Sequence, residues 1–549
     1  MDWLNKLSSQ QVKVKKQDRK LFAKKSIELL VEYFLNNSVL PTCCLSYGKD
    51  SMSMLSVTLL SWKLAIDKKP QLAKIPFVIA YSDTRVEMPI KVNYIDEINQ
   101  IINNYAKEHN ILVSIVKASP PVQSSWQGKI VGGSIKQWDV RLGRGNGCAV
   151  DWKIATLKKA LKYYDQVAKS TGLTLVKFIG VRNNESAIRD VRNAKLGLNM
   201  YQTHELNGEY CRYPILNWSL SDVWDYLLFC ENTKDSPLPG ISDGFPQTVK
   251  FYNSMSSSEC SAIDGQASSC EGGRDGCFLC AANPSVDLDI DLIQSNPHVK
   301  PLVEYRLFML ANNLNIYNRS YVQPRPSVIG EYKATSHSGA YLLDLLRIGL
   351  TIQEREKERA AHEKMLVDTG LHLSPETALI EPQFTIFESK DIAFIDFNWM
   401  IRGLQIEPSA ALKAYFDIVF NGMRYDIPNG YKRNVPYAED PAKDTGTVYY
   451  EDLLLEDDFD FNIENLTQSW QFANDDEFDV LFGSHRLISA WLTESDHAKV
   501  AARWISSGLI KPPKSQAERI FKRVQWVTHI YDNNLHHLSF KGGPYLTTI

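Results

Sequence analysis

Residues 39–60 read VLPTCCLSYGKDSMSMLSVTLL, and this stretch decides how the first part of the chain folds. The apolar run at 39–45 predicts a buried strand, and apolar residues after position 51 recur at helical spacing. The hexapeptide between them, 46–51, contains a glycine, two serines and Lys49. Backbone N–H groups and the helix dipole converge at such a strand–loop–helix turn, and a lysine adds a full positive charge. The stretch predicts a nucleotide-phosphate site, with an ordinary polar turn as the alternative.

The composition is typical of a soluble globular protein with several domains. The chain has 549 residues, which is too long for one ordinary core; 44% of them are hydrophobic and 23% are charged. We expect three regions, at residues 1–235, 236–370 and 371–549. The net charge of −3 provides no overall basic field, so any contact with nucleic acid must use a local patch.

Two other features of the sequence concern its compartment. The N-terminus lacks the apolar segment of a signal peptide, and no apolar stretch is long enough to span a bilayer. We therefore expect a cytoplasmic protein with no membrane partner. Nine cysteines in such a protein are more often thiols, metal ligands or catalytic groups than disulfides.

Short apolar runs alternate with helical patterns over the first 200 residues or so, which predicts an α/β fold with a doubly wound parallel sheet. Ligands bind such sheets at the carboxyl ends of the strands, where we expect the polar clusters at 46–51, 82–87 and 180–189 to converge. Helical patterns after residue 340 predict a mostly helical C-terminal region. The expected strands are 39–45, 75–81, 111–116 and 173–181, and the expected helices are 11–37, 90–109, 151–168 and 341–365.

Four cysteines lie close together in a loop-rich segment, at Cys260, Cys270, Cys277 and Cys280. Four thiolates in a glycine-rich loop can hold zinc or an iron–sulfur cluster. The spacing includes only one C-x2-C pair, whereas zinc ribbons usually combine two, which favours a [4Fe-4S] cluster over zinc. Unliganded core cysteines are the third interpretation.

The hexapeptide at 46–51 is similar to the S-x-G-K-D-S signature of PP-loop ATP pyrophosphatases, and it lacks the spacing of a Walker A loop. Together with the cysteine segment, it resembles the DndC family, the sulfurtransferase-type subunits of bacterial DNA phosphorothioation systems, in the phosphoadenylyl-sulfate reductase branch of PP-loop proteins. The other segments that carry this resemblance are 81–89 (YSDTRVEMP), 148–154 (CAVDWKI), 180–189 (GVRNNESAIR), 214–218 (PILNW) and 222–224 (DVW).

The resemblance implies a role for particular residues. ATP would be bound by Ser46, Gly48, Lys49, Asp50, Ser51, Ser82, Lys153 and Gly180. Catalysis would involve Lys49, Asp50, Asp83, Arg182, Glu185, Arg189 and Cys148. Asp50 or Asp83 would assist a Mg²⁺ ion. Cys148 could relay sulfur, because nearby lysines would favour its thiolate; a buried structural thiol is the alternative.

The implied function is activation of a DNA backbone phosphate oxygen with ATP, releasing AMP and pyrophosphate, so that sulfur can replace that oxygen. The implied partners are DNA, a cysteine desulfurase that donates sulfur, and other subunits of a phosphorothioation complex that acts in restriction–modification and antiphage defence. Three alternatives remain at this point: a sulfonucleotide reductase, a tRNA thiolase, and a non-catalytic nucleotide-binding scaffold. Cys280 is the last cysteine and residues 281–549 follow it, whereas a sulfonucleotide reductase usually ends in a short cysteine-containing tail.

Overall fold

A computed structural model provides the structure of this protein. The residues that it describes are 11–139, 141, 147–185, 187–231, 245–255, 277–281, 288–320, 336–437, 466–532, 534, 536 and 540.

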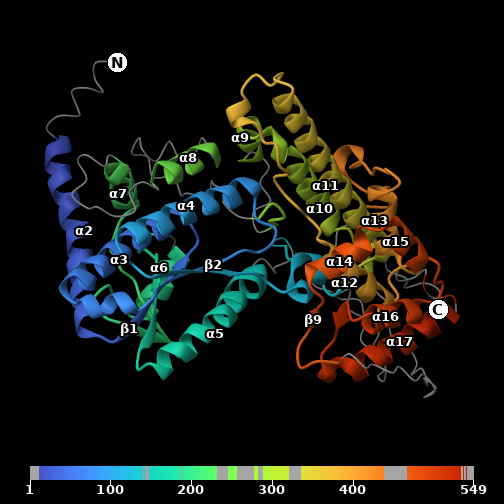
Figure 1. The fold of residues 1–549 in the computed structure, drawn as a ribbon, viewed down its shortest axis with the longest axis horizontal. Coiled ribbons are helices and arrows are strands. Elements are labelled where there is room, and N and C mark those ends of the chain that lie inside the picture. Colours follow the sequence, from blue (N-terminus) through green and yellow to red (C-terminus); the bar gives the residue numbers. More distant parts are fainter. Residues whose placement is uncertain are drawn as a thin grey trace.

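The N-terminal half of the chain is built on a six-stranded sheet (Figure 1). The spatial order is β3-β2-β1-β4-β6-β5; only β5 is antiparallel to its neighbour, and the other neighbours are parallel. The predicted doubly wound α/β fold is therefore confirmed. The strand bounds are β1 (Val39–Leu45), β2 (Phe77–Ser82), β3 (Val113–Ala118), β4 (Thr174–Ile179), β5 (His204–Leu206) and β6 (Glu209–Arg212).

Helices cover both faces of the sheet, with α3 (Lys49–Lys68) and α4 (Pro89–Glu108) on one face and α5 (Ala155–Ser170) on the other (Figure 1). Helix α2 (Gln11–Asn36) packs against α3, and α6 (Ala187–Lys195) follows β4. A wider helical turn at Ala149–Ile154 precedes α5, so the helix predicted from 151 begins as an irregular turn.

Aromatic side chains fill the space between α2, α3 and the sheet. Phe34 and Trp62 are fully buried, with ring centroids 5.0 Å apart in an edge-to-face arrangement, and Phe178 of β4 lies 5.6 Å from Phe34. Such edge-to-face pairs are favourable beyond the area that they bury. The face of α2 that carries Phe34 is thus part of the core.

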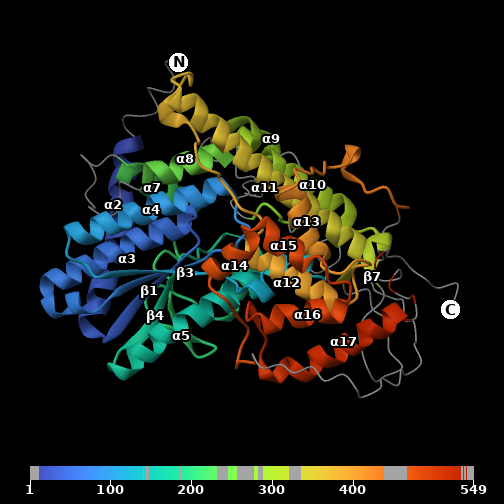
Figure 2. The same cartoon turned by 45° about the vertical axis from the view of Figure 1, so that its right-hand side comes forward.

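The C-terminal part is mostly helical, as predicted, and lies beside the sheet half of the molecule (Figures 1 and 2). Its helices are α9 (Leu288–Ser295), α10 (Lys300–Asn313), α11 (Gly339–Asp368), α12 (Ser389–Met400), α13 (Ala410–Val419), α14 (Asp475–Phe482), α15 (His485–Trp491), α16 (His497–Ser506) and α17 (Ala517–Asp532). Helices α7 (Leu220–Glu231) and α8 (Phe245–Met255) precede them, and two short antiparallel pairs join β7 (Arg319–Ser320) to β8 (Ser336–His337) and β9 (Gln471–Phe472) to β10 (Ile510–Lys511).

Helix α12 connects the two halves of the molecule. The indole N–H of Trp399 donates to the carbonyl oxygen of Val131 at 2.7 Å. Just before the helix, the Ile386 carbonyl oxygen accepts a 2.8 Å hydrogen bond from the Gln127 amide. These bonds tie the helical region to the segment that follows β3. The division into three domains at residues 1–235, 236–370 and 371–549 stays a prediction.

A second connection between the halves is an ion pair with a buried carboxylate. The Arg85 guanidinium, just after β2, binds both carboxylate oxygens of Asp391 at 2.8 and 2.9 Å, and Asp391 is fully buried in the first turn of α12. Glu388 lies 2.9 Å from the same guanidinium and forms a capping box with Asp391. Burial raises the pKa of Asp391, while Arg85 acts in the opposite direction.

None of the helices within the described ranges is both long enough and apolar enough to cross a lipid bilayer.

We predict that Asp391→Asn destabilises the protein by about 3 kcal/mol, because it leaves the buried Arg85 guanidinium without its bidentate partner. Unfolding in urea measures this change. The control is Asp67→Asn, which breaks an exposed pair with Lys63 on α3 and should cost about 0.5 kcal/mol. Equal, small losses for the two variants would contradict the prediction.

Candidate nucleotide site

The loop after β1 has the geometry expected of an anion-binding turn. Gly48 is the N-cap residue of α3 and has no side chain to cap the first-turn N–H groups. The Ser46 hydroxyl accepts a 3.4 Å hydrogen bond from the Gly48 N–H, and the Ser51 hydroxyl donates to the Gly48 carbonyl oxygen at 2.9 Å. These bonds fix the loop around the positive end of a 20-residue helix, which is a favourable place for a phosphate.

The buried side chain of Tyr47 holds the loop in place. Its backbone is in the left-handed region (φ 61°), its side chain is buried, and its hydroxyl donates a 2.5 Å hydrogen bond to the Asn99 side chain of α4. Its ring packs edge-to-face on Tyr81 of β2 at 5.2 Å. A non-glycine residue with positive φ at this position indicates that packing holds the turn in a strained conformation.

The end of β4 lies directly against the first turn of α3. The Arg182 guanidinium is buried and hydrogen-bonded to the Asp50 carboxylate. A Cβ atom on Gly180 would lie 2.9 Å from both the Asp50 carbonyl oxygen and the Ser51 Cα. Only glycine allows this approach. Since β1 lies between β2 and β4, this contact is at the switch point of the sheet, where ligands of doubly wound folds bind.

Two aromatic residues hold Lys49 on the other side of the loop. The Lys49 ammonium lies 5.0 Å from the ring centroid of Tyr252 in α8 and 5.9 Å from that of Trp224 in α7. The Tyr252 hydroxyl accepts a 3.0 Å hydrogen bond from the Lys49 backbone N–H. Cation–π contacts of this kind orient a lysine without neutralising it. In the sequence, Trp224 lies in the motif at 222–224, but it had no assigned role. No sequence pattern predicted a role for Tyr252.

The end of β2 supplies the third side of the site. The Ser82 hydroxyl donates to the Lys153 carbonyl oxygen at 3.1 Å, which brings the turn before α5 beside β2. The Asp83 carboxylate pairs with the Lys117 ammonium of β3 at 2.7 Å and accepts a 2.8 Å hydrogen bond from the Arg85 N–H. Asp83 is thus a fixed carboxylate at the strand edge, of the type that Mg²⁺ prefers.

Two predicted residues lie further along the chain after β4. Glu185 is exposed in the turn that follows Arg182. Arg189 belongs to α6, but its side chain lies outside the described residues, as does the whole of Ser186. The predicted roles of Glu185 and Arg189 stay predictions.

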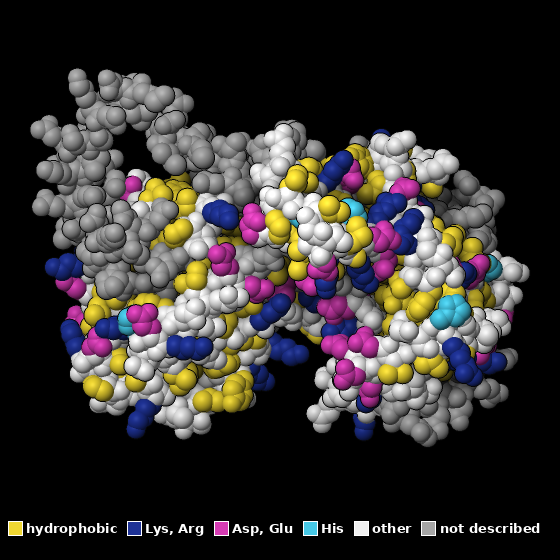
Figure 3. Space-filling model, turned by 45° about the horizontal axis from the view of Figure 1, so that its top comes forward, with side chains coloured by type: hydrophobic (Ala, Val, Ile, Leu, Met, Phe, Trp, Pro, Cys, Tyr) yellow, Lys and Arg dark blue, Asp and Glu magenta, His cyan; other side chains and the backbone are white. Residues whose placement is uncertain are grey.

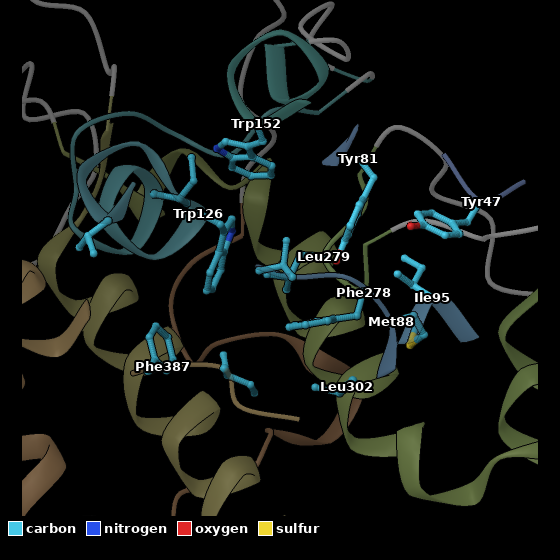
Figure 4. Close-up of a cluster of buried hydrophobic side chains, with 14 of the residues drawn as sticks. Tyr47, Tyr81, Met88, Ile95, Trp126, Trp152, Phe278, Leu279, Leu302 and Phe387 are labelled. Carbon is cyan, nitrogen blue, oxygen red and sulfur yellow. The ribbon is translucent and has the colours of Figure 1, made fainter. Parts of the chain in front are cut away.

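The described cysteines of the predicted cluster pack beside the end of β2. Cys277 forms an antiparallel bridge with Glu87, and the Phe278 N–H donates to the Val86 carbonyl oxygen at 2.9 Å. Figure 4 shows Phe278 and Leu279 among buried side chains from several parts of the chain. The short segment 277–281 is therefore built into the core.

Three thiols interact in this region. A hydrogen bond with Cys280 and burial raise the pKa of the Cys277 thiol well above its usual value. Burial, followed by the neighbouring Cys280, raises the pKa of Cys148, and Lys153 lowers it by less. The expectation that nearby lysines give Cys148 thiolate character is therefore wrong, because burial outweighs the lysine.

Cys277 and Cys280 supply two adjacent soft ligands, which suit either zinc or an iron–sulfur cluster. The other two predicted ligands, Cys260 and Cys270, lie outside the described residues. Among the residues that are described, no group of three or more His, Cys, Asp or Glu side chains is arranged to hold a metal ion.

Comparison with known proteins supports the class of domain that this geometry defines. Residues 41–239 match the family model described as the phosphoadenosine phosphosulfate reductase domain. The matched residues include β1 from its third residue onward, β2 to β6, the loop at 46–51 and the contact between Asp50 and Arg182. This part of the chain is a PP-loop domain of the phosphoadenosine phosphosulfate reductase type. The cysteine segment and the helical C-terminal region lie beyond the match, and no curated protein matches the chain.

We predict that Gly180→Ala lowers ATP affinity at least tenfold, because the added methyl group pushes the end of β4 away from the first turn of α3. Isothermal titration with ATP measures the effect. The control, Gly172→Ala, introduces a side chain at positive φ where the surrounding space is open. It should cost about 1 kcal/mol of stability and leave ATP affinity intact. Wild-type affinity in Gly180→Ala would contradict the predicted contact.

A second prediction concerns the cysteines. Protein purified without oxygen should be brown, and Cys277→Ser and Cys280→Ser should each lose most of the visible absorption, because each removes a thiolate ligand. Cys211→Ser, in β6, is the control and should keep the colour. Colourless protein that contains one zinc per chain would contradict the iron–sulfur assignment.

Proposed function

We propose that this protein is an ATP pyrophosphatase and sulfurtransferase that activates a non-bridging oxygen of a DNA backbone phosphate for replacement by sulfur. The observation that carries the proposal is the convergence of Lys49, the first turn of α3 and the Asp50–Arg182 pair at the switch point of the sheet. The match of residues 41–239 to a nucleotide-using PP-loop domain supports it.

In the first step, the DNA phosphate oxygen attacks the α-phosphorus of ATP. A new P–O bond forms, the bond to the β-phosphate oxygen breaks, and pyrophosphate leaves with the bonding electrons. Lys49 and the N-terminus of α3 stabilise the negative charge that develops on the leaving group. Asp50 holds Arg182 against the loop, so that the guanidinium is positioned before the substrate binds. Asp83 and the phosphates would hold Mg²⁺, which supplies further charge neutralisation.

In the second step, sulfur replaces the activated oxygen. A persulfide on Cys148, loaded by a cysteine desulfurase, attacks the DNA phosphorus through its terminal sulfur, and AMP leaves. A second thiol then attacks the Cys148 sulfur of the S–S bond, which releases the phosphorothioate and leaves a disulfide. An external thiol supplies that second thiol, and a further equivalent of the thiol reduces the mixed disulfide and restores Cys148.

DNA is proposed as the acceptor because the motifs resemble those of phosphorothioation proteins, and the other subunits of such a complex are the proposed partners. Figure 3 shows basic and acidic side chains interspersed on the face in view, in keeping with the net charge of −3. DNA would therefore be held through local contacts and through partner subunits, for which the helical C-terminal region offers a separate surface.

A sulfonucleotide reductase is the second candidate, because the matching family model carries that description. The discriminating measurement is the substrate. A reductase consumes phosphoadenosine phosphosulfate with a thiol reductant and yields sulfite, whereas the proposed enzyme splits ATP to AMP and pyrophosphate.

We predict that Lys49→Ala lowers pyrophosphate release from ATP by at least 100-fold, since it removes the full positive charge that the loop contributes to the leaving group. Lys68→Ala, an exposed lysine at the other end of α3, is the control and should behave as wild type. Full pyrophosphate release by a folded Lys49→Ala protein would contradict the assignment of the loop.

The acceptor is tested separately. Mass spectrometry of host DNA should detect phosphorothioate dinucleotides when the gene is present and none when it is deleted or carries Lys49→Ala. Stimulation of pyrophosphate release by tRNA and not by DNA would instead favour a tRNA thiolase.

A further inference from the structure

Three arginines meet where α17 packs against the turn that follows α12. Arg402 belongs to this turn, and Arg519 and Arg523 lie about one helical turn apart on α17. A Cβ atom on Gly403 would lie 3.6 Å from a methyl carbon of Val527 in α17. Residues four apart share one face of a helix, so Val527, Arg523 and Arg519 lie along the same face. The packing at Gly403 therefore brings this face of α17 beside Arg402.

The hydrogen bonds of Arg402 go to neutral oxygen atoms. Its Nε donates to the side-chain oxygen of Asn398 at 3.1 Å, and one terminal nitrogen donates to the Ser134 hydroxyl at 3.2 Å. Within the part of the chain that the structure describes, none of the three arginines pairs with a carboxylate. The acid next to Arg519 in the chain is Glu518, and it pairs with Lys522 at 2.6 Å.

The three positive charges are close enough to act on one another. Burial, and then the charges of Arg523 and Arg519, lower the pKa of Arg402 well below its usual value. Burial, and then Arg519, lower the pKa of Arg523 to about 10. Like charges at this separation, and like charges four residues apart on one helix, destabilise the folded chain. An anion bound among the three side chains would offset this repulsion.

The exposure of the arginines indicates what kind of anion fits. Arg519 is exposed, whereas Arg402 and Arg523 are half-buried, so the cluster opens onto the surface along α17. Such an open cluster suits a polyanion that passes over the surface better than a small anion that must be enclosed. Guanidinium groups match the geometry of phosphate oxygens and bind them with two parallel hydrogen bonds. A chain with a net charge of −3 needs a local basic patch of this kind to hold nucleic acid.

The cluster is connected to the proposed site of sulfur transfer. Ser134, which accepts from Arg402, lies in the same segment after β3 as Lys129. Lys129 pairs with Asp151 in the turn before α5, and this turn begins directly after Cys148. Helices α5 and α17 both lie on the lower side of the molecule in Figures 1 and 2. A strand that contacts the cluster can therefore extend along this side toward Cys148.

We propose that Arg402, Arg519 and Arg523 bind the sugar–phosphate backbone of the acceptor DNA, at a site separate from the candidate nucleotide site. The inference rests on the proposed function, because it takes DNA as the acceptor. Contacts to phosphates position a nucleic acid without reading its sequence, so the cluster serves every target sequence equally.

The test is binding of short dye-labelled DNA, single-stranded and duplex, to the full chain, measured by fluorescence anisotropy at several NaCl concentrations. Wild type should bind at least one form. Arg519→Gln and Arg523→Gln should each weaken that binding about fivefold at physiological salt, whatever the sequence. Each should also make the logarithmic dependence of the association constant on salt less steep by about 0.7 to 0.9, because one phosphate contact is lost. ATP affinity measured without DNA should not change.

Two comparisons guard against an indirect effect. Arg486→Gln removes an exposed arginine from α15 and is the matched control, which should bind DNA as wild type does. The midpoint of urea unfolding should be unchanged or higher in Arg523→Gln, since the variant removes a repulsion between like charges. A lower midpoint together with unchanged DNA binding would overturn the inference, because Arg523 would then bind a group of the folded chain itself.

The outcomes separate this inference from the proposed function. Wild-type protein that splits ATP but binds neither form of DNA contradicts the arginine site alone, and so do variants that bind DNA as tightly as wild type. Preference for tRNA over both forms of DNA would also overturn the inference. Wild-type protein that binds DNA through the arginines but does not split ATP contradicts the proposed function instead.

Discussion

The contact between the end of β4 and the first turn of α3 is the constraint on which the site depends. Gly180 lets the two backbones approach to a distance that no other residue permits, and Arg182 then reaches Asp50. This contact brings a buried guanidinium to the positive end of a helix, beside a lysine held by aromatic rings. Three sources of positive potential thus meet at one point, and the proposed binding and splitting of a nucleoside triphosphate rests on them.

The helical C-terminal region is part of the same arrangement. Arg85 follows β2, orients Asp83 through its backbone N–H, and is itself fixed by the fully buried Asp391. Because one arginine makes both contacts, the position of the Asp83 carboxylate depends on α12. The region beyond residue 370 therefore supports the edge of the candidate nucleotide site.

The sequence predicted the sheet and most of the polar residues at the carboxyl ends of its strands. It did not predict the contacts between distant segments. The four predicted strands are all present, with boundaries shifted by at most two residues at either end, because buried parallel strands give continuous apolar runs. The sequence also indicated that the strand-end residues converge. It assigned no role to Glu87, Gln127 or Tyr252, since a single polar residue in a helix or loop carries no periodic signal. It also overestimated the thiolate character of Cys148, whose burial is a tertiary property.

The sequence by itself determined the order of the strands and helices along the chain and the glycine-containing loop at 46–51, which lies within the matched domain, because these features are local. Only the tertiary structure decided that Arg182 pairs with Asp50, that Arg85 pairs with Asp391, and that the Lys49 ammonium lies over the ring of Tyr252. These contacts join residues far apart in the chain. They depend on how closely side chains and backbones pack, to within a few tenths of an ångström. Hydrophobic patterns and motifs do not encode packing at this precision.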